Sequence, residues 1–382
     1  MTAPKLFWVA GEPSGDLHAA GVLRELRQRL PDARHEGYGG VRMRAEGFDL
    51  RYDLAGDAVM GIFPVIKALP HILKLLSAAE DRLRTERPDA VVLVDYPGFN
   101  YRLAAKAKAL GIPVLWYIAP QVWAWGAWRL KKTARLVDRL LCILPFEETI
   151  FRAAGVDAIY TGHPVVDHLT KAPRDPATAK RLALHRGSGP LIGVFPGSRG
   201  HVVDSLLPDF AKTIRRVFDR MPEARFAVAV AAERFERRIA DMFRDEPRVL
   251  CITGKGPDVM DAADLALTTS GTTTLELAAS AKPFVIGYRV SPVFYAIAKS
   301  LMRVDHIGLV NLVAGRTVVP EHVGFSDLDG RLAEDVLRLA GSPAAAEDQR
   351  RGLAEVRAKL DVRGAYARAA EEVVRFVASR RA

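Results

Sequence analysis

Two carboxylates, Glu12 and Asp16, lie in the turn GEPSGD, between an apolar run and an amphipathic segment. A strand, a glycine turn and a helix in this order are typical of the start of nucleotide-binding α/β folds. Phosphate often binds at a helix amino terminus, but carboxylates placed there would repel it. The turn therefore raises the question of what it holds and where any phosphate would bind.

Two later turns suit an anion better. In FPGSRG, residues 195–200, Gly197 lets the backbone turn closely, Ser198 can donate a hydrogen bond and Arg199 offers a planar guanidinium. In TTSGTTTLELAA, residues 268–279, no acid comes before Glu276, which could bind a ribose diol. Helix capping and a plain surface turn are the alternatives. We expect phosphate contacts from Arg199 and from the second turn, namely Ser270, Gly271, Thr272 and Thr273.

A general base is predicted in VVLVDYPGFN, residues 91–100. Asp95 ends a fully apolar strand. If Pro97 takes the first helical position, Tyr96 is the N-cap and Asp95 lies outside the helix. The Asp95 carboxylate could then accept a substrate proton, although a purely structural aspartate in a turn remains an alternative.

Tryptophan is concentrated in WYIAPQVWAWGAWRLKK, residues 116–132, where Trp123, Trp125 and Trp128 fall in an expected loop. Such a loop favours a stacking or lipid-facing surface over a core position. The nine histidines show no spacing typical of a zinc site, so no catalytic metal is expected.

The elements that position these residues alternate between strands and helices along all 382 residues. The predicted fold is α/β, with two doubly wound Rossmann-like domains facing each other across a cleft. The expected boundaries are 1–168 for the first domain, 169–189 for a linker rich in proline and glycine, and 190–343 for the second domain. Residues 344–382 are expected to form one C-terminal helix that packs back on the first domain.

Composition limits the partners. The net charge is +10, so an anionic membrane, a phosphorylated substrate or nucleic acid must be considered. No nucleic-acid motif appears, and we expect no such partner. The N-terminus is too acidic and glycine-rich for a signal peptide, and no apolar run reaches the roughly 18 residues of a membrane span. A cytoplasmic protein is expected.

One segment, Ala58–Leu76, favours membrane contact. It is strongly apolar and its only charged residues are lysines, which suits an interfacial element, although a buried core helix fits the same pattern. The expected membrane-contact residues are Met60, Ile62, Phe63, Val65, Ile66, Lys67 and Lys74.

Taken together, the motifs resemble those of the lipid-A-disaccharide synthases, inverting glycosyltransferases of the B-type, two-Rossmann architecture. The resemblance extends over nearly the whole chain. The motifs, in order, are GEPSGD, GYGGVRMRAEG, AVMGI, VDYPGFN, APQVWAW, LPFE, GHP, PGSRG, SGTTTLE, KPFVIGYR and NLVAGR.

This resemblance implies a reaction. UDP-2,3-diacylglucosamine would be joined to 2,3-diacylglucosamine 1-phosphate, giving a β-1,6-linked disaccharide and UDP, with no cofactor. The expected place is the cytoplasmic surface of the inner membrane, with peripheral attachment, and a homodimer would be compatible. Other UDP-sugar enzymes of this fold, such as 2-epimerases, fit the UDP side equally well, but the motifs of the first domain favour the synthase.

The resemblance also answers the opening question. It assigns the first domain to the acceptor, whose hydroxyl and amide groups need carboxylate acceptors, and the second domain to UDP. The implied catalytic residues are Asp95 and Arg199. The implied UDP-binding residues are Gly197, Ser198, Arg199, Ser270, Gly271, Thr272, Thr273, Glu276 and Asn311. The implied acceptor-binding residues are Glu12, Ser14, Gly15, Asp16, Gln121 and Trp123.

The chain departs from the family pattern at two positions. Gly98 stands where the family has a second acid after the catalytic aspartate, and Val202 stands where the family has glutamate after the PGSR arginine. The nearest substitutes for these missing acids are His201 and Asp204.

Overall fold

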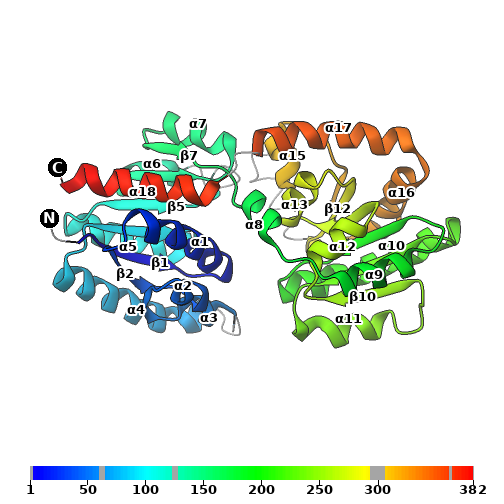
Figure 1. Ribbon diagram of the computed structural model, residues 1–382, viewed down its shortest axis with the longest axis horizontal. Helices are drawn as coiled ribbons and strands as arrows, with labels where there is room; N and C mark the ends of the chain where they lie inside the picture. The colour runs from blue at the N-terminus through cyan, green and yellow to red at the C-terminus, as the bar shows by residue number, and fades with distance from the viewer. Residues whose placement is uncertain (1–2, 60–64, 123–127, 293–305, 361–363, 382) are drawn as a thin grey trace. The chain divides into compact units, whose positions relative to one another are not determined.

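The computed structural model describes residues 3–59, 65–122, 128–292, 306–360 and 364–381. They divide into two units, residues 1–167 with 362–382, and residues 168–361. Each unit is a parallel sheet with helices on both faces (Figure 1). This confirms the prediction of two doubly wound α/β domains.

Unit 1 contains a seven-stranded sheet in the order β3-β2-β1-β4-β5-β6-β7. Its strands are β1 (Lys5–Ala10), β2 (Arg34–Tyr38), β3 (Asp49–Tyr52), β4 (Ala90–Val94), β5 (Val114–Tyr117), β6 (Arg139–Cys142) and β7 (Ala158–Tyr160). Its helices are α1 (Pro13–Arg29), α2 (Val41–Ala45), α3 (Leu54–Val59), α4 (Val65–Glu86), α5 (Pro97–Ala109), α6 (Trp128–Leu136), α7 (Pro145–Ala153) and α18 (Ala365–Arg381), and α8 (Val165–Lys171) leads out of the unit.

Unit 2 contains a six-stranded sheet in the order β10-β9-β8-β11-β12-β13. Its strands are β8 (Leu191–Phe195), β9 (Arg225–Val230), β10 (Val249–Thr253), β11 (Leu265–Thr269), β12 (Phe284–Arg289) and β13 (Glu321–Gly324). Its helices are α9 (Pro176–Arg186), α10 (Gly200–Arg220), α11 (Glu236–Met242), α12 (Gly256–Ala262), α13 (Thr273–Ala279), α15 (Leu309–Ala314), α16 (Leu328–Gly341) and α17 (Pro343–Leu360), and a 3₁₀ turn covers Glu233–Phe235.

The strand order reverses between β1 and β4 in unit 1, and between β8 and β11 in unit 2. In open parallel sheets, ligands bind at such a switch point, beyond the carboxyl ends of the strands. The turns after these four strands are GEPSGD, the Asp95 turn, GSRG and SGTT. These four segments therefore lie at the switch points of their own sheets, whereas the tryptophan-rich segment, 116–132, begins in β5.

The buried strands of unit 1 explain why the sheet is covered on both faces. Phe7 and Trp8 are adjacent on β1 and both fully buried, and they join different apolar clusters. Successive strand residues point to opposite faces, so each cluster packs under its own helical layer. The cluster that contains Trp8 includes Phe376 of α18, which lies beside α1 (Figure 1).

The sequence missed two strands. β3 and β13 are four-residue edge strands with mostly charged or half-exposed side chains, so neither shows an apolar run. The expected single helix over 344–382 is two helices in the structure. α17 packs on α13 and α15 in unit 2, whereas α18 packs on α1 in unit 1. Gly364, at φ +74°, stands just before α18, and its left-handed conformation is one that glycine adopts without strain. The expected linker, 169–189, contains helix α9.

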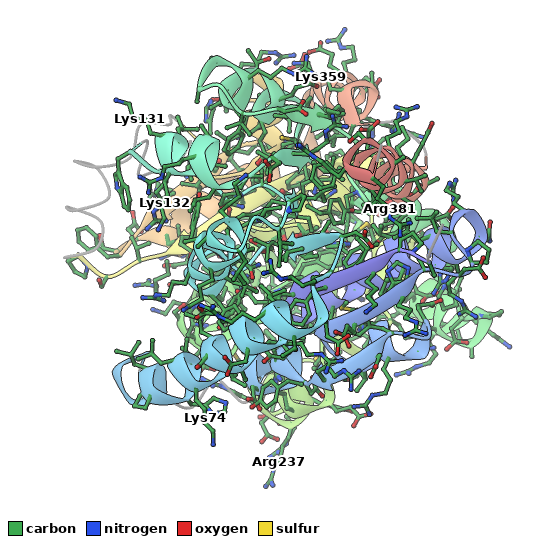
Figure 2. The ribbon with its side chains drawn as sticks, turned by 90° about the vertical axis from the view of Figure 1, so that its left-hand side faces the viewer. Lys74, Lys131, Lys132, Arg237, Lys359 and Arg381 are labelled. Carbon is green, nitrogen blue, oxygen red and sulfur yellow. The ribbon has the colours of Figure 1, made fainter. Side chains whose placement is uncertain are left out.

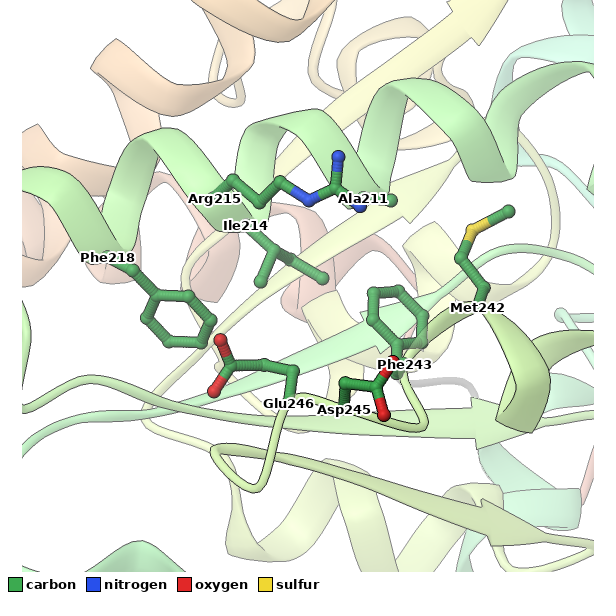
Figure 3. A pocket seen from close by; sticks show the side chains of 8 residues that line it. All are labelled: Ala211, Ile214, Arg215, Phe218, Met242, Phe243, Asp245 and Glu246. Atoms are coloured by element: carbon green, nitrogen blue, oxygen red, sulfur yellow. The ribbon is translucent and has the colours of Figure 1, made fainter.

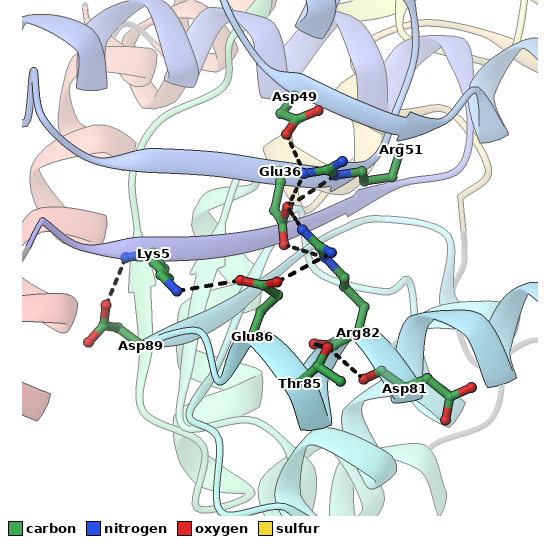
Figure 4. Close-up of polar contacts among 9 residues, drawn as sticks. All are labelled: Lys5, Glu36, Asp49, Arg51, Asp81, Arg82, Thr85, Glu86 and Asp89. Carbon is green, nitrogen blue, oxygen red and sulfur yellow. Dashed lines mark hydrogen bonds and ion pairs between the residues drawn. The ribbon is translucent and has the colours of Figure 1, made fainter.

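Charged groups fasten α4 to the edge of the first sheet (Figure 4). Glu36 of β2 accepts hydrogen bonds from Arg82 of α4 at 2.9 Å and from Arg51 of β3 at 2.8 Å. Burial alone would raise the pKa of Glu36, but the hydrogen bonds and charges of the two arginines outweigh it and hold that pKa below its usual value. The network thus fixes the C-terminal part of α4, the helix whose first half belongs to the predicted membrane segment.

Candidate functional site

Asp95 occupies a strained turn. It follows β4 at φ +47°, and Tyr96 follows at φ +47°, ψ 58°. Two successive non-glycine residues in the left-handed region are rare and cost of the order of 1–3 kcal/mol each. Tyr96 is the N-cap of α5 and Pro97 takes the first helical position, as the sequence predicted.

Asn100 holds this turn in place. Its side chain is fully buried, and its amide nitrogen donates to the carbonyl of Asp95 at 2.7 Å and to that of Val94 at 3.3 Å. The Asp95 N–H donates to the carbonyl of Tyr117, at the end of the neighbouring strand β5. A strained turn clamped on both sides is the arrangement expected where a side chain must be aimed.

Tyr96 joins the Asp95 turn to the GEPSGD turn. A Cβ built on Gly11 would lie 2.1 Å from the Tyr96 ring, so only glycine leaves room for that ring. Burial raises the pKa of Tyr96, and the negative charges of Glu12 and Asp57 raise it further. Carboxylates from the β1–α1 turn and from α3 therefore stand near the Tyr96 hydroxyl, beside Asp95.

Asp16, predicted to bind the acceptor, has a structural role. It is 3% exposed, and its carboxylate accepts backbone N–H groups of Arg42 at 3.1 Å and Met43 at 3.0 Å. These are orphan donors in the first turn of α2. A Cβ on Gly40 would lie 2.7 Å from the Asp16 carboxylate, and one on Gly39 would clash with the Met43 sulfur, which explains the paired glycines of GYGG.

We expect Asp16→Ala to lower the free energy of unfolding by about 1–3 kcal/mol, because two helix donors lose their acceptor. Urea unfolding of the variant and of Ser14→Ala, an exposed neighbour, measures this difference. Unchanged stability together with a higher KM for the acceptor would instead support the predicted binding role of Asp16.

The other predicted acceptor residues differ in exposure. Glu12 is the N-cap of α1 and is half-buried, Ser14 is exposed, and Gly15 is buried against β1 and β4. Gln121 is exposed beyond β5, and Trp123 lies outside the described residues. Glu12, Ser14 and Gln121 are thus the accessible members of the set.

In unit 2, the GSRG turn joins β8 to α10. Gly197, at φ +104°, bends the chain, and a Cβ there would lie 3.2 Å from Thr269 of the adjacent strand. Arg199 is the N-cap of the 21-residue helix α10, and both Ser198 and Arg199 are exposed. The first amides of α10 and the Arg199 guanidinium therefore present positive charge at the same end of the helix.

The SGTT turn lies beside it, after β11. Thr272 is the N-cap of α13, yet no side-chain hydrogen bond caps that helix. The Ser270 hydroxyl donates to the carbonyl of Ile307 at 2.9 Å. Helix capping, the alternative explanation for these hydroxyls, is therefore not what they do in the described structure.

Two buried groups complete this edge of unit 2. The hydroxyl of Thr269 is buried and has no hydrogen-bond partner among the described residues. Glu276, on α13, is largely buried; burial raises its pKa, which a hydrogen bond from Thr273 partly offsets. An unpartnered hydroxyl beside Gly197 suits a site that a polar ligand completes.

Asn311, predicted to bind UDP, is fully buried. Its amide oxygen accepts from the backbone of Val318 at 2.8 Å and Val319 at 3.0 Å, and its nitrogen donates to the carbonyl of Val319 at 2.8 Å. The side chain thus holds the chain between α15 and β13. Because these contacts use both ends of the amide, the structure gives Asn311 a structural role.

The departures from the family pattern are now located. Gly98 is exposed, and a Cβ there would meet nothing within 4 Å, so the missing acid leaves open space. Val202 packs under Gly197. Of the suggested substitutes, Asp204 forms an ion pair with Arg238, whereas His201 is exposed.

Much of the predicted membrane segment lies outside the described part of the chain. Met60, Ile62 and Phe63 lie outside the described residues, as do the side chains of Val65, Ile66 and Lys67. Beyond them on α4, Lys74 is exposed, and Leu69 and Leu73 are 40% and 49% exposed. No described helix is long and apolar enough to cross a bilayer.

The sequence also missed polar groups near the site in unit 1. Tyr52, at the end of β3, donates to Asp57 of α3 and lies 2.8 Å from His71 of α4. Burial, followed by the Asp57 hydrogen bond and charge, raises the pKa of Tyr52 to about 12. No motif marks these residues, because three separate elements bring them together. Among the described residues, no group of three or more metal-ligating side chains occurs.

A separate hollow of about 240 Å³ lies on unit 2 (Figure 3). It is lined by Ala211, Ile214, Arg215, Phe218, Met242, Phe243, Asp245 and Glu246. These residues belong to the C-terminal half of α10, to the last residue of α11 and to the loop between α11 and β10, whereas the GSRG turn is at the amino end of α10. The hollow is therefore not part of the edge that is predicted to bind phosphate.

Known proteins resemble this chain in sequence and in fold. A model of the family described as lipid-A-disaccharide synthetase matches residues 6–370. The lipid-A-disaccharide synthase of Myxococcus xanthus is 40% identical over 375 residues, which cover 98% of each chain. Among solved structures, the UDP-GlcNAc 2-epimerase from Neisseria meningitidis bound to UDP-GlcNAc gives a TM-score of 0.61 at 16% identity, covering 99% of this chain and 100% of that one. A calicheamicin glycosyltransferase gives 0.63 at 16%, covering 99% of each. At such identities the structures show the fold alone.

Proposed function

The chain belongs to the lipid-A-disaccharide synthase family and is a hexosyltransferase of lipid A disaccharide synthesis. We propose that it joins UDP-2,3-diacylglucosamine to 2,3-diacylglucosamine 1-phosphate. The family match extends from β1 to α18, so it includes the turns of both units. The epimerase alternative rests on fold similarity only, since the epimerase structure is 16% identical.

The observation that carries the proposed mechanism is the clamped turn of Asp95. In this mechanism the oxygen of the acceptor 6-hydroxyl attacks C1 of the donor sugar, and the Asp95 carboxylate accepts the proton of that hydroxyl. The bond between C1 and the phosphate oxygen breaks on the opposite face, which inverts the anomeric centre. Glu12 and Ser14 would accept and donate hydrogen bonds to the acceptor.

UDP leaves with an additional negative charge. We assign its stabilisation to Arg199, to the first amides of α10 and to the turn formed by Ser270, Gly271, Thr272 and Thr273. Fixed dipoles and charges at the leaving group can stabilise the transition state in this way. Glu276 is assigned to the ribose.

Mass spectrometry of the product tests the proposed function. Purified protein is incubated with the two diacylglucosamine substrates, and the expected product is the disaccharide 1-phosphate together with equimolar UDP. Formation of free 2-epimerised sugar from UDP-N-acetylglucosamine, without a disaccharide, would contradict it.

Peripheral attachment to an anionic membrane is the second part of the proposal. Lys74 of α4 and Lys131 of α6 are exposed on unit 1, and Figure 2 shows them at its lower and upper left. Exposed apolar side chains accompany them, since Leu73 is 49% and Trp128 is 67% exposed. Each basic residue near an anionic surface contributes about 1 kcal/mol, and each buried CH₂ about 0.8 kcal/mol.

We expect Leu69→Ser combined with Leu73→Ser to reduce co-sedimentation with anionic liposomes and to raise KM for dispersed lipid substrates. Leu184→Ser is the matched control, because Leu184 is 77% exposed but lies on unit 2. Equal sedimentation of the double variant and the control would place membrane contact elsewhere, with the Trp123–Trp128 segment examined next.

A further inference from the structure

His306 lies next to the phosphate-binding turn of unit 2. It stands two residues before Gly308, the N-cap of α15, and α15 packs against α13. The residue between them, Ile307, accepts the hydrogen bond of the Ser270 hydroxyl through its carbonyl. A side-chain-to-backbone contact therefore attaches the His306 segment directly to the SGTT turn.

A carboxylate fixes the imidazole. Glu321 is the first residue of β13, and its Oε1 lies 3.0 Å from Nδ1 of His306. The Glu321 carboxylate also accepts hydrogen bonds from the backbone N–H groups of Ile307 at 3.2 Å and Gly308 at 2.8 Å. The His306 and Glu321 side chains are only 17% and 11% exposed. A histidine whose Nδ1–H donates to a carboxylate has a set ring orientation, and Nε2 is its other functional nitrogen.

The residues around His306 suit contact between a positively charged imidazole and an anion at the SGTT turn. Ser270, Gly271, Thr272 and Thr273 carry no charge. Glu276, the next acid along the turn, is largely buried and is hydrogen-bonded to Thr273. Glu321, for its part, is already engaged by two backbone N–H groups as well as by the ring.

We propose that His306 is a further phosphate-binding residue, which Glu321 positions and which donates through Nε2 to the diphosphate of UDP. This assignment rests on the proposed function, because it takes the SGTT turn as the diphosphate site. It adds a second basic group to Arg199, from a different element of the same unit.

A second pair supplies the matched control. His322, the next residue on β13, lies 2.7 Å from Asp335 of α16, and these side chains are 19% and 20% exposed. Neighbouring strand residues point to opposite faces of a sheet, so His322 and Glu321 lie on different faces. The two histidine–carboxylate pairs are thus alike in burial, but only the His306 pair adjoins a residue, Ile307, whose carbonyl accepts a hydrogen bond from the SGTT turn.

The experiment measures the affinities of UDP and uridine for His306→Asn, His322→Asn and the wild type by calorimetry. An asparagine amide can occupy the place of Nδ1 and keep the bond to Glu321, but it has no counterpart of Nε2. We expect His306→Asn to weaken UDP binding about 10- to 100-fold, the range for a hydrogen bond to a charged group, and to leave uridine binding within twofold. His322→Asn should bind both ligands as the wild type does.

Two results would overturn the assignment. If His306→Asn binds UDP as tightly as the wild type, His306 does not contact the diphosphate. If it loses UDP and uridine to the same extent, His306 only supports the fold of the site. A wild-type protein that makes the disaccharide in either case leaves the proposed function standing, whereas a wild type that binds no UDP would overturn both.

Discussion

Replacing Asp95 with asparagine is expected to lower kcat by about 10²–10⁴-fold, the usual contribution of a positioned general base, and to leave UDP affinity nearly unchanged. The reason is positional. Asp95 belongs to unit 1, whereas the residues assigned to UDP belong to unit 2. Steady-state assays of disaccharide formation, with UDP binding measured by calorimetry, check both parts.

The strain of the turn makes a sharper design possible. Asparagine tolerates the left-handed region well, alanine tolerates it poorly, and glycine adopts it without steric strain. We therefore expect Asp95→Gly to be more stable than Asp95→Ala by about 1 kcal/mol, while both remain as inactive as Asp95→Asn. Turnover would then depend on whether residue 95 carries a carboxylate, and stability would depend on how well residue 95 adopts the left-handed backbone conformation.

A control carboxylate is available on the same sheet. Asp49, at the exposed edge strand β3, pairs with Arg51, and Asp49→Asn should leave kcat unchanged. Near-normal turnover in Asp95→Asn, with Asp49→Asn equally active, would remove Asp95 from the role of base.

The sequence predicted the architecture well because the signal repeats. Each buried strand is an apolar run followed by a glycine or polar turn, and two such series predict two parallel sheets. The same reasoning placed Asp95 outside α5, because Pro97 marks the first helical position. What it could not predict is the left-handed backbone of Asp95 and Tyr96, which depends on the contacts of Asn100 and Gly11.

Binding residues were harder to predict than elements. Asp16 and Asn311 stand in motifs, and their residue types suit a sugar or a nucleotide. In the structure, however, backbone groups use both side chains, and residue type alone does not tell a ligand contact from a cap. His306, which we propose as a binding residue, is marked by no motif, and only tertiary packing brings its segment to Ser270 through Ile307.

Replacing Arg199 with alanine is expected to lower kcat/KM by about 10²–10³-fold and, unlike the Asp95 variants, to weaken UDP binding as well. The guanidinium stands at the N-cap of α10, where it adds to the positive end of the helix. Both the bound diphosphate and the leaving group are negatively charged, so its loss should affect ground state and transition state together. Arg199→Lys keeps the charge without the planar fork, and we expect intermediate activity.

Arg237 is the matched control for Arg199. It also lies on unit 2, its side chain is 96% exposed, and it forms a loose ion pair with Asp241 at 3.9 Å (Figure 2). Arg237→Ala removes the same charge from the unit without touching the GSRG turn, so it separates a local contact from a general change in electrostatic attraction. Equal loss of UDP affinity in both variants would mean that overall charge, not the Arg199 contact, draws in the nucleotide.

The same variants test whether protein groups alone stabilise the leaving UDP. If Arg199 and the neighbouring amides supply this positive charge, EDTA should leave wild-type turnover unchanged, and added magnesium should not restore Arg199→Ala. Arg199→Ala should also slow turnover at saturating substrate, because the charge of Arg199 matters most as the bond to C1 breaks. Loss of activity in EDTA that magnesium restores would show that a metal ion shares this task, and Arg199 would then be one of several groups that hold the diphosphate.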